Sequence, residues 1–167
     1  MAPRFEDLIE QHHDEIFAYL WRLLGNERQS DVTLEVEDLT QEVFLRAFEN
    51  FLRLRRDSNY RAWLYKIATN CAYAKLRQSK NRREKNLTLE IIGTDTTTSP
   101  ISESMHKRLS ALVEALPAKQ RACLTMRYLQ DLDYSEIGSI LDCTEESARA
   151  NVYQAIRRLR AALEEDI

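Results

Sequence analysis

Residues 60–85 combine aromatic rings with concentrated positive charge, which is the combination that a nucleic-acid surface needs. The stretch YRAWLYKIATNCAYAKLRQSKNRREK holds eight lysines and arginines against one acid, Glu84, in a chain whose net charge is −3. Cations neutralise phosphates, and aromatic faces stack on unpaired bases. The alternative is a buried helix that runs out into a solvated charge run, and composition alone does not separate the two.

A narrow stripe of binding groups runs along the helix expected over residues 60–83. Spacings of four, three and four place its members on one helical face. The stripe consists of Lys66, Asn70, Tyr73 and Arg77, with Trp63 at its edge. Cations, an amide and rings on one face suit the bases and backbone of a partly opened strand. The alternative is an amphipathic helix whose polar face is solvated and whose Trp and Tyr belong to the core.

The segment from residue 134 onward has the pattern of a helix-turn-helix. A short helix over 134–141 and a turn over 142–144 precede a longer helix that starts at Glu145. Gly138 lies inside the first helix, where glycine costs about 1 kcal/mol relative to alanine. A small residue there makes sense if a second helix crosses close by. Thr144 is expected to cap the longer helix, which would be the reader. An ordinary αα-hairpin is the alternative.

The longer helix is poor in basic residues at its start. Glu145 and Glu146 open it, and acids there favour the helix dipole but repel phosphates. A glutamate can also accept a hydrogen bond from cytosine N4, so that one of the two acids could read a base. We favour the dipole explanation because it is simpler.

The helix expected over residues 36–52 carries a polar face that suits either of two interpretations. Asp38, Gln41, Glu42 and Arg46 project together. An apolar stripe on the same helix should pack inward, and it consists of Leu39, Val43, Ala47, Phe48 and Phe51. Glu42 and Arg46 could form a simple i,i+4 pair, worth about 0.2–0.5 kcal/mol. The polar face could instead dock a partner protein, but spacing alone favours the pair.

These motifs require helices to position them, and the composition agrees. Among 167 residues, three glycines and three prolines argue for helices and against an all-β fold. Acids dominate residues 1–50 and bases dominate 51–85, which suggests two faces for two partners, unless the clustering is random. The pattern predicts further helices over 5–24, 102–115, 118–130, 134–141 and 145–164. Polar residues 26–35 and basic residues 54–59 are expected to be loops.

We therefore expect an all-α fold of two small helical domains joined by a flexible linker, the second with a helix-turn-helix. The linker signature is GTDTTTSP at 93–100, which lacks apolar residues. The expected boundaries are 1–86 for the first domain, 87–104 for the linker and 105–167 for the second domain.

Other classes of function find little support in the sequence. Cys71, Cys123 and Cys143 are far apart and odd in number, which fits reduced, buried thiols in a cytosolic protein. His12 and His13 are adjacent, so on a helix they point about 100° apart and would not share a metal. There is no glycine-rich phosphate loop, no GxSxG and no long apolar run. We expect no enzymatic activity, no metal or cofactor, no membrane insertion and a cytoplasmic location.

Read together and in order, the motifs resemble a bacterial RNA polymerase sigma factor of the extracytoplasmic-function type. EDLTQEVFLRAF, from residue 37, resembles that family's core-polymerase-binding helix. YRAWLYKIATNCAYAKLR, from residue 60, resembles its promoter-melting and minus-ten-reading helix. LPAKQRACLTMRYLQDLDYSEIGSIL, from residue 116, resembles the start of its last domain, which the minus-thirty-five helix-turn-helix follows.

The resemblance implies three sets of contact residues and three partners: core RNA polymerase, promoter DNA and an anti-sigma factor. The polymerase set is Asp38, Gln41, Glu42, Phe44 and Arg46. The minus-ten set is Arg55, Arg56, Asn59, Arg61, Trp63, Lys66, Asn70, Tyr73 and Arg77, with a flipped base held by the loop at 54–59. The minus-thirty-five set is Thr144, Glu146, Arg149, Tyr153, Gln154 and Arg157.

The chain departs from the family pattern in two places. The acidic loop at 26–35 is longer than usual, and the last helix carries acids and amides where the family has small and basic residues. Two other functions therefore stay open. One is a polymerase-independent helix-turn-helix regulator, although such proteins usually dimerise and no dimer helix is obvious here. The other is a sigma-like decoy that binds polymerase or an inhibitor without reading DNA.

Overall fold

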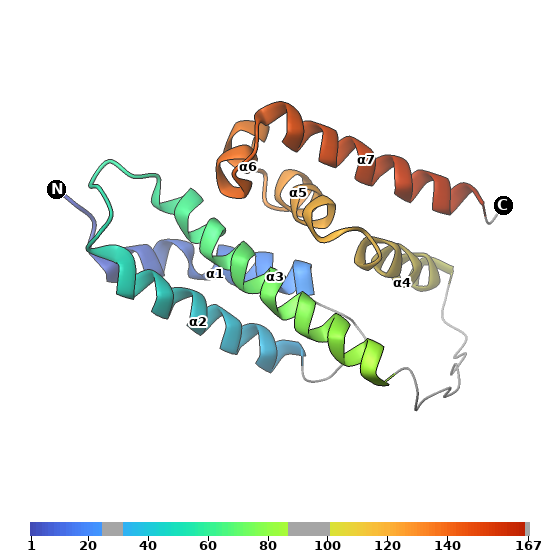
Figure 1. Cartoon of the computed structure of the whole chain (residues 1–167), viewed down its shortest axis with the longest axis horizontal. Helices are drawn as coiled ribbons and strands as arrows, with labels where there is room; N and C mark the ends of the chain where they lie inside the picture. The colour runs from blue at the N-terminus through green and yellow to red at the C-terminus, as the bar shows by residue number, and fades with distance from the viewer. Residues whose placement is uncertain (25–31, 87–100, 166–167) are drawn as a thin grey trace.

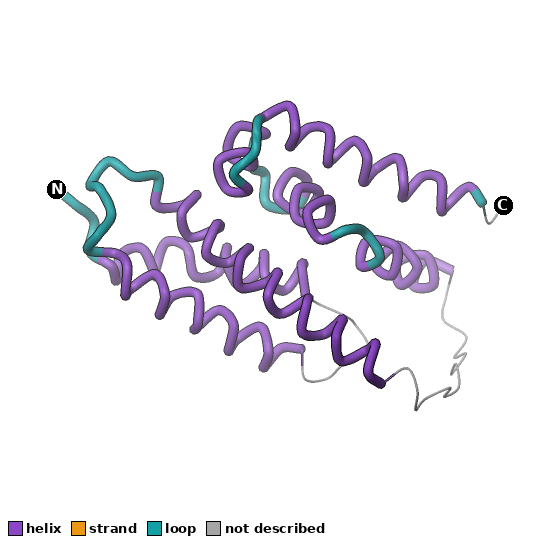
Figure 2. The backbone as a smooth tube through the Cα atoms, in the orientation of Figure 1, coloured by secondary structure: helices purple, strands orange, loops and turns teal. Residues whose placement is uncertain are grey.

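The computed structural model describes residues 1–24, 32–86 and 101–165, with side chains at 82–86 and 101–103 excepted. These residues form seven α-helices and no strand, which confirms the all-α prediction (Figures 1 and 2). The helices are α1 (Phe5–Leu24), α2 (Val32–Phe51), α3 (Tyr60–Asn86), α4 (Ile101–Glu114), α5 (Ala118–Tyr128), α6 (Tyr134–Leu141) and α7 (Glu145–Glu164). The two termini lie at opposite ends of the molecule (Figure 1).

Helices α1, α2 and α3 pack against one another as a three-helix domain. Each contributes apolar side chains at helical spacing, such as Ile16 and Leu20 of α1, Val43 of α2, and Leu64 and Ala68 of α3, all almost fully buried. Their burial is the main favourable term that holds the three helices together.

Helix α2 begins one turn earlier than the sequence pattern predicts, at Val32 and not at Val36. Val32 and Val36 are both buried, so the core stripe of the helix extends one i,i+4 step toward its start. The loop expected over 26–35 is correspondingly shorter, and its residues 26–31 lie outside the described part of the chain. Phe48, expected to face inward, is 62% exposed, although its ring lies edge-on to Phe5.

Helices α4 to α7 form the second domain, in which α7 contacts α4, α5 and α6. The predicted bounds of α6 and α7 agree with the structure. Helix α4 begins at Ile101, so the end of the segment expected to be linker is helical, while residues 87–100 lie outside the described residues.

The two domains also contact each other, which the sequence pattern does not predict. Helix α3 packs against α6 and α5, and α1 packs against α5 (Figure 1). One continuous apolar cluster contains Tyr65 and Ala68 of the first domain together with Met126 and Ile137 of the second. Helix α3 is therefore a central element that one domain supplies and both domains cover.

Candidate nucleic-acid interface

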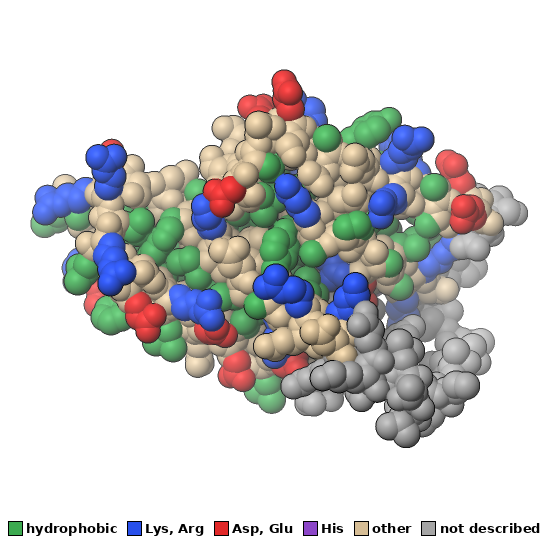
Figure 3. Space-filling model, viewed as in Figure 1, with side chains coloured by type: hydrophobic (Ala, Val, Ile, Leu, Met, Phe, Trp, Pro, Cys, Tyr) green, Lys and Arg blue, Asp and Glu red, His purple; other side chains and the backbone are tan. Residues whose placement is uncertain are grey.

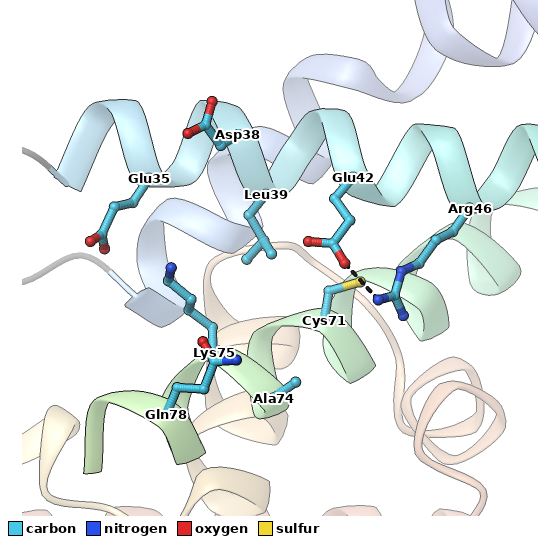
Figure 4. Close-up of a pocket in the computed structure, with 9 residues that line it drawn as sticks. All are labelled: Glu35, Asp38, Leu39, Glu42, Arg46, Cys71, Ala74, Lys75 and Gln78. Atoms are coloured by element: carbon cyan, nitrogen blue, oxygen red, sulfur yellow. Dashed lines mark hydrogen bonds and ion pairs between the residues drawn. The ribbon is translucent and has the colours of Figure 1, made fainter. Parts of the chain in front are cut away.

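The polar face predicted on α2 borders a hollow between α2 and α3 (Figure 4). From α2 it is lined by Glu35, Asp38, Leu39, Glu42 and Arg46, and from α3 by Cys71, Ala74, Lys75 and Gln78. Figure 4 shows Lys75 extending from α3 towards Glu35. The acids of α2 are thus partly balanced by a cation from α3, and the rim of the hollow is accessible to solvent.

Glu42 and Arg46 form the i,i+4 pair that the spacing predicts, with 2.6 Å between Oε1 of Glu42 and Nη2 of Arg46. Both side chains are about half exposed. Exposed pairs of this kind contribute little to stability, so the pair leaves both groups available to a partner at small cost. Asp38 and Gln41 are exposed on the same helix.

Phe44 does not have the exposure that its predicted role requires. Its side chain is 8% exposed, and its ring stacks on His13 with a centroid distance of 5.8 Å. The large apolar side chains that α2 presents to solvent are instead Leu34, Leu45 and Phe48, at 62%, 64% and 62% exposed. A helical wheel on which the buried Val32, Val36 and Val43 face the core places these three on the opposite side.

The basic loop between α2 and α3 is exposed at Arg55, Arg56 and Asn59. Lys and Arg side chains gather over this loop and along the visible side of α3 (Figure 3). The Oδ1 atom of Asn59 accepts a hydrogen bond from the backbone N–H of Ala62 at 3.1 Å. Asn59 therefore caps the start of α3, and its amide oxygen is already used there.

The predicted stripe on α3 is divided between solvent and the second domain. Asn70 and Arg77 are exposed. The Nζ atom of Lys66 lies 2.6 Å from Oδ1 of Asp142, which belongs to the turn of the helix-turn-helix. Tyr73 is half-buried, and its buried hydroxyl has no hydrogen-bond partner among the described residues. Burial raises the pKa of Tyr73, so it is a neutral phenol at physiological pH.

A second hollow lies where the edge of this stripe meets the end of α2. It is lined by Arg46, Glu49, Asn50, Trp63, Ile67 and Asn70. It joins a ring, an apolar side chain and two amides, which are the groups that hold an unstacked base. Glu49 and Asn50 did not appear in the sequence prediction. The signal that could have found them is their place three and four residues after Arg46.

Arg61, predicted to contact DNA, is held within the protein. Its Nε donates a hydrogen bond to Oε1 of Glu15 at 2.7 Å, and its Nη1 lies 3.7 Å from Oε1 of Glu136. The hydroxyl of Tyr65 donates to the same Glu15 oxygen at 2.8 Å. Burial raises the pKa of Glu15, but hydrogen bonds from Arg61, Tyr65 and His12 together outweigh it, so the pKa lies below its usual value. No local pattern marks Glu15 as their partner.

The helix-turn-helix has the geometry that its sequence predicts. Oγ1 of Thr144 accepts a hydrogen bond from the backbone N–H of Ser147 at 3.0 Å, which confirms it as the cap of α7. A Cβ added at Gly138 would lie 2.7 Å from the backbone oxygen of Cys143, which confirms that this position must be small. Asp133 and Glu136 form a capping box at the start of α6.

The face of α7 that would read DNA is exposed, but two of its polar side chains already have partners within the chain. Glu146, Arg149, Tyr153, Gln154 and Arg157 are all exposed. Nη2 of Arg149 lies 3.1 Å from Oε1 of Glu145, and Oε1 of Gln154 accepts a hydrogen bond from Gln120 at 3.2 Å.

Arg149 has a second partner in Tyr134, the first residue of α6. Its guanidinium carbon lies 4.9 Å from the centroid of that ring. This contact and the ion pair with Glu145 hold the Arg149 side chain beside the angle between α6 and α7. Less of its positive charge is then available to a phosphate.

Within the described residues, no cluster of His, Cys, Asp and Glu could hold a metal ion. No described helix is both long and apolar enough to cross a membrane. Cys71 and Cys123 are buried free thiols, as predicted, and Cys143 is half-buried.

Comparisons with known proteins match each of the two helical domains to a described family. Residues 8–83 match the family description of Sigma-70 region 2, and residues 106–159 match Sigma-70, region 4. Solved structures with 18% sequence identity share the fold over 98% of this chain. They are the sigma factor RpoE in complex with the anti-sigma factor NepR from Bartonella quintana (98% of that chain, TM-score 0.69), and CnrH in complex with the cytosolic domain of CnrY (89% of that chain, TM-score 0.68).

Curated relatives give the same answer. The ECF RNA polymerase sigma factor SigW of Bacillus subtilis is 27% identical over 95% of this chain and 88% of its own length. SigE of Mycolicibacterium smegmatis is 26% identical over 95% of this chain and 61% of its own. The sigma-E factor of Escherichia coli K12 is 29% identical over 72% of this chain and 70% of its own. With regions 2 and 4 in this order in one helical chain, the protein belongs to the extracytoplasmic-function (ECF) sigma factors of bacterial RNA polymerase.

Proposed function

We propose that two neighbouring helices divide the sigma-factor task of promoter-specific transcription initiation, with α2 binding core RNA polymerase and α3 holding the opened promoter strand. The observation that carries this division is the exposed apolar face of α2, formed by Leu34, Leu45 and Phe48. Large apolar side chains exposed together on one helix mark a protein-binding site.

The polymerase contact combines this apolar face with a polar border. Asp38, Gln41, Glu42 and Arg46 are exposed along α2, and the Glu42–Arg46 pair can open at little cost. Leu45 and Phe48 would make the apolar polymerase contact that the resemblance gives to Phe44, because apolar anchors at the centre of an interface supply most of its affinity.

The opened strand would lie along the exposed side of α3. The second hollow offers the Trp63 ring for stacking and the amides of Asn50 and Asn70 for hydrogen bonds to a base edge. Arg55 and Arg56 in the preceding loop, and Arg77 further along α3, are exposed and suit phosphates. Flipping a base costs a few kcal/mol, which these contacts must offset.

The second domain would read duplex DNA upstream. Helix α7 would enter the major groove as the second helix of a helix-turn-helix, with Arg149, Tyr153 and Arg157 toward the DNA. The working boundaries are 1–86, 87–104 and 105–167. The protein would act in the cytoplasm and perform no chemistry, because the polymerase supplies it. An anti-sigma factor is a further proposed partner, since a protein of the same fold, RpoE of Bartonella quintana, was solved in complex with one.

The polymerase assignment is tested by replacing Leu45 with glutamate. Leu45→Glu should abolish co-purification with core RNA polymerase and promoter-specific transcription in vitro, while leaving the helical content unchanged because Leu45 is exposed. The matched control is Leu109→Glu on α4, an exposed leucine of the second domain, which should bind polymerase normally. Normal polymerase binding by Leu45→Glu would overturn the assignment, and binding by neither wild type nor variant would favour a polymerase-independent regulator.

A further inference from the structure

The second hollow, between the end of α2 and α3, is assigned above to a base of the opened strand, yet an acid lines it. Glu49 is exposed there and has no hydrogen-bond or ion-pair partner among the described residues. DNA carries a negative charge at every phosphate, so a free carboxylate in this place repels every strand alike. Glu49 therefore lowers the affinity for any strand whose base does not supply a compensating contact.

The local fold does not account for this acid. Glu49 lies in the last turn of α2, which ends at Phe51 and has no basic residue in that turn. The negative end of the helix dipole lies there, so an acid is unfavourable and a cation would be favourable. Arg46, three residues earlier, could neutralise Glu49 but pairs with Glu42 at 2.6 Å (Figure 4). The carboxylate of Glu49 is therefore left as a hydrogen-bond acceptor for a ligand in the second hollow.

The neighbouring amide is oriented so that it adds a second acceptor. The Nδ2 atom of Asn50 donates a hydrogen bond to the backbone carbonyl oxygen of Arg46 at 2.9 Å. A carbonyl oxygen can only accept, so the amide nitrogen of Asn50, and not its Oδ1, must face it. Oδ1 of Asn50 has no partner among the described residues. The end of α2 thus supplies two adjacent acceptors to the second hollow, and one of them is charged.

Helix α3 supplies hydrogen-bond donors to the same hollow. The indole N–H of Trp63 can only donate, and it has no partner among the described residues. Asn70 is exposed further along the same helix, and its amide can donate as well as accept. A base in the second hollow would therefore meet acceptors from α2 and donors from α3.

The four bases differ in the groups that they would present to these side chains. Cytosine and adenine carry an amino donor, at N4 and N6, beside a ring nitrogen that accepts a hydrogen bond. Thymine and guanine carry a carbonyl oxygen, O4 and O6, in place of that amino group. A carbonyl oxygen set against a carboxylate makes no hydrogen bond, because neither group can donate, and both lose hydration. The acceptors of α2 therefore match cytosine and adenine and do not match thymine and guanine.

We propose that Glu49 and Asn50 make the second hollow selective for a base with an amino donor, cytosine or adenine, against thymine and guanine. This inference rests on the proposed assignment of the hollow to a base of the opened strand, and it adds which bases the hollow accepts. Selectivity is a difference of affinities, and here it combines attraction of the amino group with repulsion of a carbonyl oxygen. Matched hydrogen bonds to a base edge discriminate by about fivefold or more.

The first test uses short DNA strands of abasic sugars that carry a single base at the centre, so that only this base can enter the second hollow. The central position is cytosine, uracil or a further abasic sugar. Trp21→Phe leaves Trp63 as the only tryptophan of the chain, so quenching of its fluorescence reports a base stacked in the hollow. The cytosine strand should bind about fivefold tighter than the uracil strand.

The outcomes separate this inference from the assignment on which it rests. Equal affinities for cytosine and uracil, both above that of the abasic strand, would overturn the selectivity and leave the base assignment standing. Tighter binding of uracil would do the same. Equal affinities for all three strands, or no binding of any, would overturn the base assignment and the selectivity together.

Two variants then test whether Glu49 is the cause of the preference. Glu49→Gln should make the affinities for cytosine and uracil nearly equal, because an amide donates as well as accepts. Glu49→Lys should reverse the preference, because an ammonium group only donates. The matched controls are Glu37→Gln and Glu37→Lys, which change the same charge at an exposed position of α2 outside the hollow. They should raise the affinity for all strands and keep the ratio of cytosine to uracil. The same ratio in the Glu49 and Glu37 variants would mean that Glu49 is only a solvated charge, and would overturn the proposal.

Discussion

Helices α3 and α7 face the same kind of ligand in the proposed function, but the protein restrains their cations in different ways. On α3, Arg61 is held by Glu15 of α1, and Lys66 is held by Asp142 of the second domain. On α7, Arg149 is paired with Glu145 of its own helix, one turn earlier. The restraint on α3 is tertiary, and movement of the second domain would release Lys66 but not Arg61, whereas the restraint on α7 is local and persists in any arrangement.

This difference suggests how a chain of net charge −3 can bind DNA only in the right context. A tertiary restraint turns α3 into a conditional surface, because its stripe is complete only when the second domain leaves. A local restraint instead sets a fixed, moderate affinity on α7, since exposed i,i+4 pairs are weak and screened by salt. The arrangement of the domains should therefore control mainly the DNA affinity of α3, and the base sequence mainly the DNA affinity of α7.

The largest effect should come from disturbing the packing of α6 against α7 in the second domain. Gly138→Ala places a methyl group 2.7 Å from the backbone oxygen of Cys143, so the α6–α7 angle must shift at a cost of about 1–3 kcal/mol. Duplex binding should be lost while single-strand binding persists or improves. Calorimetry and two titrations measure this, with the exposed Ser139→Ala as control. Loss of single-strand binding to the same extent would break the comparison.

The next effect separates the two helices by the DNA that they bind. Trp63→Ala should weaken single-strand binding by about 1–3 kcal/mol, because base–ring stacking is removed, and should leave duplex binding nearly unchanged. Tyr153→Ala, at a side chain 67% exposed on α7, should do the reverse. Fluorescence anisotropy with each variant and each DNA checks both, and circular dichroism confirms folding. The same response from both variants would mean that the two helices do not divide the task.

A smaller effect concerns the local restraint on α7. Arg149→Ala should weaken promoter-duplex binding and lower the slope of log affinity against log salt by about 0.9, the value for one phosphate contact. Glu145→Ala should leave affinity equal or higher, because it frees Arg149 from its 3.1 Å pair. Mobility-shift titrations at several salt concentrations measure both. If Glu145→Ala weakens binding as much as Arg149→Ala, then Glu145 contributes to reading and the pair is not a restraint.

The accuracy of the sequence prediction followed the range of the interactions concerned. The bounds of α6 and α7, the cap at Thr144 and the need for a small residue at Gly138 are local properties, and the structure confirms them. Spacing also predicted the Glu42–Arg46 pair, because both partners lie on one helix face. Phe44 was assigned to a polymerase contact by resemblance and not by spacing, and its side chain is only 8% exposed because it lies beside the core stripe of α2.

The docking of the domains could not be predicted in this way. Gln130 and Glu15 come from distant parts of the chain, and neither lies in a periodic pattern that points to the other. Their contact depends on how two folded domains meet, which helical spacing does not encode. The same reason hides the engagement of Arg61 and Lys66, since each is paired across elements and not along one helix.

The smallest effect should appear in the acid dependence of stability, where Glu15 distinguishes the two helices. The hydrogen bonds that hold its pKa below the usual value come partly from Arg61 and Tyr65 of α3, whereas the carboxylate that pairs with Arg149 on α7, Glu145, is exposed. Because the folded state lowers this pKa, the contribution of Glu15 is fully present above the unfolded pKa, near 4.5, and is lost as the pH falls through the folded value.

Between neutral pH and pH 4, the wild type should therefore lose more stability than Glu15→Gln, by about 1 kcal/mol or less. Urea unfolding at both pH values measures this, and Glu10→Gln, at an exposed acid of α1, should behave as wild type. If Glu15→Gln loses as much as wild type, then the carboxylate does not stabilise the arrangement of Arg61 and Tyr65 on α3.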